Sequence, residues 1–567
     1  MKKLQHLFLR IRSLILVVIL TASFTGAYSQ GGESDFEISK NLDIFVTLYK
    51  QLQVNYVDDL NSGQLMKTAI DAMLESVDPY TVYIPESEIE DYRFMTTGQY
   101  GGIGSMIQKR NAWVYISEPY QGFPADKAGL KAGDKIIEIN GKSAKGKTVE
   151  EVSTALKGQP GTEVKLLIER DTTEKPFEKS IIREEITVEN VPYSGMVSDS
   201  IGYINLSEFK QNAGSDVKDA FLRLKENHNL KGVILDLRGN GGGLLAEAVN
   251  IVNIFVERGQ LVVSTKGKLK DRNNNHNTMN APVDLDMPLV VLVNEGSASA
   301  SEIVTGAIQD LDRGVVIGQR TYGKGLVQNI VPLTYNAQMK VTIAKYYIPS
   351  GRCVQELDYA HKDNEGEATK MADSLKRAFK TKNGRTVYEG GGIDPDILMA
   401  PEEYSNIAQA LITNYLVFDY ATTFYRAHPQ IAKPKDFIIT DDIYTDFQKF
   451  LSNKHYSYTT QSEKALEKLK ENAEKEKYFD AIKTEFDVLQ NKMMHEKTDD
   501  LQKFKSQISI LLKLYIIPRY YYQKGRIEAA LVDDPEVKKA IEVLQNRSLY
   551  KSILDGTYIK ENPKEKK

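Results

Sequence analysis

A serine and a lysine carry the first chemistry that this sequence suggests. Ser299 follows an apolar run at 288–293 and precedes an apolar-periodic run that starts at Ile303, so the pattern predicts a buried strand, a tight turn and a helix. With Glu302 three positions on, Ser299 fits a capping box, which places its hydroxyl at a helix mouth where N–H groups point outward. A serine hydroxyl held at such a corner, with backbone N–H groups nearby to bind an oxyanion, is suited to acyl-transfer catalysis. An ordinary capped helix after a strand is the alternative.

Lys324 stands between two glycines, with apolar strand patterns at 315–317 and 326–331 on either side. The Lys324 ammonium is therefore expected to lie at a surface that is partly shielded from water. Desolvation favours the neutral amine, and a lysine whose pKa falls by about three units from roughly 10.4 can act as a general base near neutrality. A loop lysine that points into water is the alternative.

The histidines favour a serine and lysine pair over a triad. A catalytic triad is recognised by geometry and not by chain order, so sequence position does not exclude one. However, all seven histidines lie outside the two segments above, which makes a Ser-Lys dyad the simpler assignment; they are His6, His228, His276, His361, His428, His455 and His495.

Two of these motifs resemble a known family. The segments SASASEI at 297–303 and TYGKGLVQ at 321–328 are similar to those of the carboxy-terminal processing (tail-specific) serine peptidases. The resemblance implies that Ser299 is the nucleophile, that Lys324 is the general base, and that Gln328 orients the lysine amine. It implies no cofactor and no metal.

A second signature of that family is a strand followed by a glycine-rich turn that helps to form the oxyanion hole. The segment VILDLRGNGGG at 233–243 matches it. We therefore expect the oxyanion donors to be the N–H of Ala300 and one N–H from Gly241, Gly242 or Gly243. A flexible turn is the alternative, although glycine is tolerated best where the backbone must come close to something.

A third region resembles a PDZ domain. Gly101, Gly102, Ile103 and Gly104 precede an alternating strand pattern, and the run AGLKAGDKIIEING at 128–141 is typical of the fold. Bare N–H groups in such a loop can surround a terminal carboxylate, and the strand after it offers an edge to an extended peptide. Taken alone, the glycine loop also fits a hairpin turn.

The order of the patterns predicts the fold class. Strand and helix patterns alternate from 201 to 317, which predicts an α/β peptidase core with a mostly parallel sheet. The resemblance implies that this core is ClpP/crotonase-like and that the PDZ domain is inserted beside it. The expected division is a signal peptide at 1–30, an N-terminal helical segment at 31–91, the PDZ domain at 92–183, the serine peptidase core at 184–400 and an all-α C-terminal region at 401–567.

Composition argues against one class of partner, and the N-terminal residues predict where the protein is located. A formal net charge of −4 gives no electrostatic case for nucleic acid, and the single cysteine, Cys353, forms no internal disulfide. Residues 1–30 combine a positive head, an apolar stretch and a small-x-small site before Gln30, the pattern of a secretory signal peptide. We expect export, and by the family likeness a periplasmic protein, or a membrane-associated one if the segment stays uncleaved.

The sequence thus predicts an exported serine endopeptidase that captures unstructured C-terminal tails of proteins through its PDZ domain. A non-catalytic PDZ-bearing scaffold that binds peptides is the alternative from another class. An acyl-CoA hydratase-type enzyme shares the strand–turn–helix corner but explains neither the export signal nor the PDZ stretch. The sequence also leaves open self-association into a homo-oligomer through the C-terminal helical region, and binding of an adaptor protein.

Overall fold

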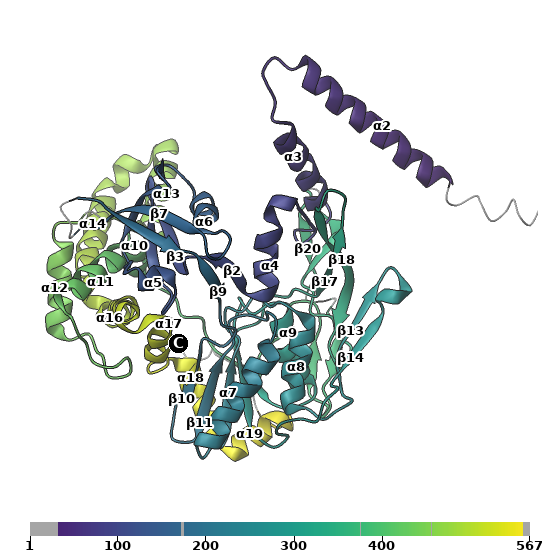
Figure 1. Ribbon diagram of the computed structural model, residues 1–567. Helices are drawn as coiled ribbons and strands as arrows, with labels where there is room; N and C mark the ends of the chain where they lie inside the picture. The colour runs from purple at the N-terminus through teal and green to yellow at the C-terminus, as the bar shows by residue number, and fades with distance from the viewer. Residues whose placement is uncertain are drawn as a thin grey trace, which may run out of the picture. The chain divides into compact units, whose positions relative to one another are not determined.

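A computed structural model describes residues 32–171, 175–363, 365–372, 374, 376–454 and 456–558 of the 567-residue chain (Figure 1). The signal peptide predicted at 1–30 lies outside the described residues. The chain divides into two compact units, with the division after Tyr83. Among the described residues, no helix combines the length and the apolar character needed to cross a bilayer.

The first unit contains two helices, α2 (Gly32–Asn55) and α3 (Ser62–Glu75). The side chain of Asn61 caps α3 by accepting from the Gln64 N–H at 3.1 Å, as an asparagine before a helix commonly does. The Tyr49 hydroxyl donates to the Ser62 carbonyl at 2.7 Å and ties the two helices together. Both helices lie within the segment 31–91, for which the sequence predicts helix.

The PDZ region opens the second unit, after α4 (Ile89–Thr97). Its sheet has the order β3-β4-β5-β7-β8, with β3 at an edge, and β2 pairs with β9 in a separate ribbon. The helix α6 contacts β3 and carries a capping box from Thr148. The elements are β2 (Gln99–Gly102), β3 (Ser105–Arg110), β4 (Trp113–Pro119), α5 (Pro124–Lys127), β5 (Lys135–Ile139), β6 (Lys142–Ser143), α6 (Val149–Leu156), β7 (Glu163–Glu169), β8 (Phe177–Ile182) and β9 (Glu184–Thr187).

A six-stranded sheet forms the centre of the peptidase core, in the order β10-β11-β12-β15-β16-β23. The strands from β11 to β23 run parallel, and β10 pairs antiparallel to β11 at one edge. Because both faces are covered, strands such as β15 are apolar throughout. The bounds are β10 (Tyr193–Met196), β11 (Ile201–Asn205), β12 (Gly232–Asp236), β15 (Leu289–Val293), β16 (Val315–Gly318) and β23 (Ile397–Leu398).

The two faces of this sheet are covered by segments from different parts of the chain. One face packs on α7 (Ala213–Asn227), α8 (Leu245–Phe255) and α9 (Ala300–Asp310), which lie between the strands in sequence. The other face packs on α18 (Pro535–Gln545) and α19 (Arg547–Leu554) through Val537, Val543 and Ile553. In Figure 1 these last two helices, in yellow, lie beside the strands of the core. The C-terminal end of the chain therefore completes the peptidase core.

A second sheet of the core is antiparallel. It contains β13 (Leu261–Gly267), β14 (Asn274–Asn277), β17 (Leu326–Pro332) and β18 (Gln338–Tyr347). The alternation of strand and helix patterns from 201 to 317 predicts a strand of the main sheet at 261–264, but the structure places this run in the antiparallel sheet, because β13 pairs with β14 and β18. Two short antiparallel ribbons follow, one formed by β19 (Leu357–Lys362) and β20 (Ala368–Lys370), the other by β21 (Ala378–Lys380) and β22 (Thr386–Tyr388).

The described part of the chain beyond 400 is helical, as predicted. A core of buried residues joins α11, α12, α16 and α17, and it includes Tyr420, Phe447 and Leu512. The helices are α10 (Asn406–Thr413), α11 (Leu416–Ala427), α12 (Asp441–Leu451), α13 (Gln461–Lys475), α14 (Phe479–Thr498), α15 (Asp500–Lys503), α16 (Lys505–Ile516) and α17 (Pro518–Ala530).

Side chains of this helical region hold the PDZ domain. Arg110, the last residue of β3, forms a two-pronged ion pair with Asp419 at 2.6 and 2.7 Å. Arg526 pairs with Glu118 at 2.8 Å, and the Tyr522 hydroxyl donates to Asp126 at 2.8 Å. The two-pronged Arg110–Asp419 contact fixes the orientation of the two side chains as well as their distance.

Candidate active site

Three loops meet at the carboxyl ends of adjacent parallel strands. They follow β12, β15 and β16, and they contain the glycine turn, Ser299 and Lys324 respectively. Ligand sites of open α/β sheets lie at this edge. The Tyr322 N–H donates to the Ser297 carbonyl at 3.0 Å, and the Ala298 N–H donates to the Asn240 carbonyl at 3.0 Å. The three loops are thus hydrogen-bonded to one another.

Ser299 is held in a strained backbone conformation at the start of α9. Its φ of 58° and ψ of −113° lie outside the regions that a serine normally occupies, at a cost of about 1–3 kcal/mol that the surroundings must offset. Such strain at a strand-to-helix corner is the geometry of a nucleophile elbow. Ser299 is the N-cap of α9 and its N–H donates to the Glu302 side chain, which is one half of the predicted capping box, while the Glu302 N–H donates to the Ser299 carbonyl at 2.9 Å. Its side chain is only partly exposed.

Glu302 is the group that connects this corner to the lysine loop. Its fully buried carboxylate accepts four hydrogen bonds. One oxygen accepts the N–H groups of Ser299 and Lys324 at 2.9 and 2.8 Å. The other accepts the Gly323 N–H at 2.8 Å and the Thr321 hydroxyl at 2.7 Å. Burial raises the pKa of the Glu302 carboxyl to about 7, although its four donors act in the opposite direction.

A single carboxylate oxygen therefore joins the backbones of Ser299 and Lys324. This brings the backbones of the two residues predicted as nucleophile and base to one carboxylate, from loops that follow the adjacent strands β15 and β16. Lys324 is half-buried. Gln328 lies on β17, where its side-chain amide donates to the Thr342 hydroxyl at 3.2 Å. Its orienting role toward the lysine stays a prediction.

The glycine turn after β12 lies directly against Ser299. A Cβ added to Gly242 would come within 2.8 Å of the Ser299 Cβ and 2.9 Å of the Ala300 nitrogen. The Gly242 N–H donates to the Asn240 side chain at 2.9 Å, so it is already engaged. The N–H groups of Gly241, Gly243 and Ala300 donate to no acceptor in the described part of the chain. These three are the available oxyanion donors among the four residues predicted.

Known protein families match this chain in three parts, which correspond to the peptidase core, the PDZ domain and the C-terminal helical region. The family model for peptidase family S41 matches residues 200–361, and the PDZ domain model matches residues 115–170. A third, described as a probable PDZ-protease C-terminal helical domain, matches residues 407–544. A carboxy-terminal-processing protease of Bartonella bacilliformis is 37% identical over 56% of this chain and 73% of its own length.

The chain belongs to this family of carboxy-terminal-processing serine proteases. A second relative, a probable CtpA-like serine protease of Staphylococcus aureus, is 35% identical over 62% of this chain and 71% of its own length. Among solved structures, a photosystem II D1 C-terminal processing protease is similar with 27% identity and a TM-score of 0.32, over 57% of this chain and 90% of that one.

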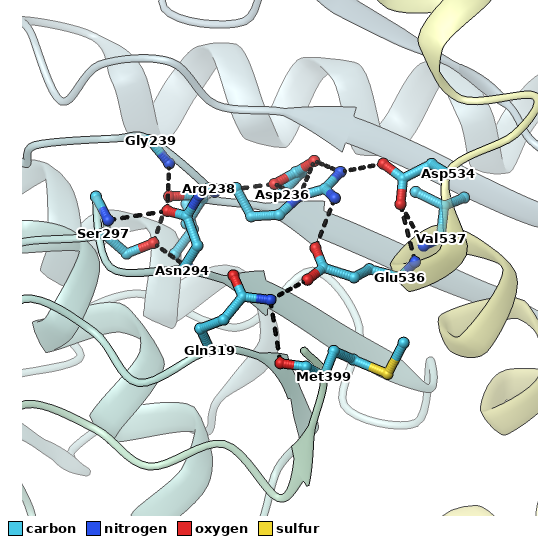
Figure 2. Close-up of polar contacts among 12 residues, drawn as sticks. Asp236, Arg238, Gly239, Asn294, Ser297, Gln319, Met399, Asp534, Glu536 and Val537 are labelled. Carbon is cyan, nitrogen blue, oxygen red and sulfur yellow. Dashed lines mark hydrogen bonds and ion pairs between the residues drawn. The ribbon is translucent and has the colours of Figure 1, made fainter. Parts of the chain in front are cut away.

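Asn240 and Asn294 are two structural residues of this protease site that sequence reasoning missed. The Asn240 side chain accepts from the Gly242 N–H and donates to the Leu206 carbonyl at 2.7 Å. The Asn294 side chain accepts the Gly239 N–H at 2.8 Å (Figure 2). It also accepts the Gly296 N–H at 3.0 Å. An asparagine that bonds its own backbone two residues on is a known turn former. The asparagines of GNGGG and VNEG carried that signal.

The PDZ loop predicted to hold a carboxylate is built differently. Gly101 and Gly102 belong to β2 and pair with Glu185 and Glu184 of β9, so they are part of a ladder. The N–H groups of Ile103 and Gly104 find no acceptor among the described residues. They precede β3, whose outer edge is open in its sheet. These two N–H groups and that edge fit an extended peptide that ends in a carboxylate.

Neither the described histidines nor the single cysteine is hydrogen-bonded to the serine corner. Of the described histidines, His361 pairs with Asp358 and His428 with the Phe424 carbonyl, and no described histidine bonds to Ser299 or Glu302. The residues that the structure describes contain no cluster of histidine, cysteine or carboxylate side chains fit to hold a metal. Burial raises the pKa of the Cys353 thiol, which does not favour a thiolate nucleophile.

Proposed function

We propose that this chain is a serine endopeptidase that captures unstructured C-terminal tails through its PDZ groove and cuts peptide bonds with Ser299 and Lys324. The observation that supports the proposal is the shared Glu302 carboxylate, which accepts the backbone N–H groups of both Ser299 and Lys324. Membership of the carboxy-terminal-processing protease family supports catalysis over the scaffold alternative.

The geometry supports a two-step mechanism. The Lys324 amine takes the proton of the Ser299 hydroxyl as its oxygen attacks the peptide carbonyl. The negative charge that develops on the carbonyl oxygen is stabilised by the N–H of Ala300 and one from Gly241 or Gly243. The lysine then gives its proton to the departing amine, and a water molecule releases the acyl group by the reverse path.

The test uses a folded carrier protein with an unstructured, apolar C-terminal tail. Ser299→Ala and Lys324→Ala are each expected to lower turnover by about 10⁴-fold or more, with unchanged tail affinity in a binding titration. Substitution of the exposed Lys464, on α13, serves as the control and is expected to keep wild-type turnover. Wild-type turnover by Ser299→Ala would remove the nucleophile assignment.

The location and the finer fold assignment are proposals as well. We propose that the protein is exported and periplasmic, with cleavage before Gln30; cell fractionation and N-terminal sequencing of the mature protein test this. The mostly parallel sheet supports a ClpP/crotonase-like core. Self-association through residues 401–567 is tested by native mass spectrometry, and an adaptor protein by cross-linking in cells.

A further inference from the structure

Arg238 lies between the end of β12 and the glycine turn and is surrounded by three carboxylates. Its guanidinium contacts Asp236 at 2.5 Å, Asp534 at 2.8 Å and Glu536 at 2.7 Å (Figure 2). Asp236 is the last residue of β12, two positions before Arg238, whereas Asp534 and Glu536 come from the start of α18, about three hundred residues later in the chain. The contact therefore joins the last part of the protein to the residue before Gly239.

The three carboxylates carry more charge than the single guanidinium, and hydrogen bonds and a helix N-terminus stabilise this excess. Asp534 caps α18 by accepting the N–H groups of Glu536 and Val537 at 2.9 and 3.1 Å, and a helix N-terminus favours negative charge. The Tyr203 hydroxyl donates to Asp236 at 2.6 Å. Burial alone would lower the pKa of Arg238, but the carboxylates outweigh it and the pKa lies above its ordinary value. The guanidinium stays charged, so the cluster is a permanent clamp.

Glu536 also reaches the loop that carries the lysine. Its second carboxylate oxygen accepts a hydrogen bond from the side-chain amide of Gln319 (Figure 2). Gln319 follows β16 directly, five residues before Lys324, and its own N–H donates to the Val293 carbonyl at 3.0 Å. The first turn of α18 thus contacts two of the three loops of the active site.

The path from Arg238 to Ser299 is short and consists of hydrogen bonds between adjacent loops. The Gly239 N–H donates to the Asn294 side chain at 2.8 Å, and the Ser297 hydroxyl donates to the Leu237 carbonyl at 2.8 Å. A shift of Arg238 would move Gly239 and with it the turn whose Gly242 abuts Ser299. The oxyanion donors lie in that turn.

We propose that Asp534 and Glu536 are positioning residues for catalysis, which act through Arg238 and Gln319 to fix the glycine turn and the lysine loop. The first turn of α18 then supports the active site, in addition to packing on one face of the sheet. This inference rests on the proposed peptidase function. Misplacement of a reacting group by about 1 Å can cost on the order of a hundredfold in rate.

The first experiment measures full kinetics of Glu536→Gln, Asp534→Asn and the double variant in the full-length protein. We expect kcat to fall about tenfold to a hundredfold while KM stays within about twofold. The matched control is Asp441→Asn, since Asp441 also lies in the first turn of a helix and pairs with Lys505 at 2.6 Å. The control is expected to keep wild-type kcat.

A tetrahedral inhibitor distinguishes positioning from a general loss of stability. A peptide aldehyde adds reversibly to the Ser299 hydroxyl, and the resulting oxyanion occupies the donors of the glycine turn. Its affinity should fall by the same factor as kcat/KM in Glu536→Gln, while the affinity for a tail peptide bound at the PDZ groove is unchanged. Equal losses in both affinities, or wild-type kcat in Glu536→Gln, would overturn the inference.

Two measurements keep the test decisive. If Glu536→Gln does not fold, Gln319→Met replaces it, since it breaks one contact of Glu536 and leaves the ion cluster intact; a kcat equal to wild type would refute the link. In the Ser299→Ala background, adding Glu536→Gln should speed hydrogen exchange at residues 239–244. It should leave the exchange rate at residues 135–139 unchanged. Failure of the wild-type protein to cleave any tail substrate refutes the proposed function instead, and the exchange result still decides the clamp.

Discussion

Two glycine-rich turns of this chain contain backbone N–H groups without an acceptor among the described residues, and they are supported in opposite ways. The PDZ turn at 101–104 is anchored by its own domain, through β9 and the loop at Gly158. The catalytic turn at 239–243 is braced by Asn240, by Asn294 and, through Arg238, by α18. A stable carboxylate can be met by a turn that adjusts, whereas an oxyanion exists only briefly and requires donors already in place.

The largest expected effect comes from a methyl group in the catalytic turn. In Gly242→Ala the new Cβ would lie 2.6 Å from the Ala298 carbonyl oxygen and 2.8 Å from the Ser299 Cβ. The turn must shift, and we expect kcat to fall by about 10²–10³-fold, the effect of losing an oxyanion donor. At Gly241 a Cβ meets nothing within 4 Å. Steady-state kinetics should therefore show a much smaller loss for Gly241→Ala; equal losses would contradict the geometry.

The next effect concerns Glu302, which has no counterpart under the PDZ turn. Folded Glu302 keeps its proton up to about pH 7, whereas the unfolded carboxyl loses it near 4.5. The folded state thus binds more protons in this window, and the contribution of Glu302 to the unfolding free energy falls as pH rises from 4.5 to 7. It falls by an amount on the order of 3 kcal/mol.

Guanidinium unfolding at pH 5 and pH 8 measures that contribution. The wild type should lose more stability between the two values than Glu302→Gln, which has no proton to release. Turnover should change in the opposite direction, because only the carboxylate form accepts all four donors of the serine and lysine loops. Parallel stability curves for the two proteins would show that Glu302 is not protonated in the folded state.

These two predictions concern contacts that sequence reasoning could only partly reach. The serine corner, the lysine between glycines and the glycine turn follow from local pattern, because strand, turn and helix signals are short-range. The contribution of α18 does not. Asp534, Pro535 and Glu536 read as a helix start, but nothing local indicates that Arg238 is their partner, since the pairing depends on how the last helices cover the sheet.

The run at 261–264 shows the same limit for a strand. Its apolar residues fit the main sheet as well as the antiparallel sheet that contains β13, because strand pattern does not specify the partner. The kink in α17 at Tyr522, with φ of 54°, also has no sequence signal. It occurs where the Tyr522 hydroxyl contacts Asp126 of the PDZ domain. Contacts between distant segments decide both features.

A smaller effect is expected in the PDZ turn itself. In Gly101→Ala the new Cβ would lie 2.0 Å from the Gly158 carbonyl oxygen, so the turn must move away from its anchor. We expect a roughly tenfold loss of affinity for a tail peptide, measured by calorimetry. Turnover of a short peptide without the tail should be unchanged. A large kcat loss on that short peptide would mean that the two turns are coupled.

The smallest effect is expected where the PDZ domain meets the helical region. The Arg110–Asp419 pair is about a quarter exposed on each side, and partly exposed ion pairs contribute about 1 kcal/mol or less. Arg110→Ala should therefore lower the midpoint of thermal unfolding slightly, with tail affinity and kcat within about twofold of wild type. A large change in kcat would show that this contact helps to set the active site.

The central claim is that the Ser299 hydroxyl becomes acylated by the substrate. Acid quenching of the wild-type protein during turnover, followed by peptide mapping with mass spectrometry, tests it directly. The account predicts an acyl adduct on the peptide that contains Ser299, absent from Ser299→Ala and accumulating in no other segment. An adduct on a different residue, while the substrate is cleaved at the normal rate, would contradict the account.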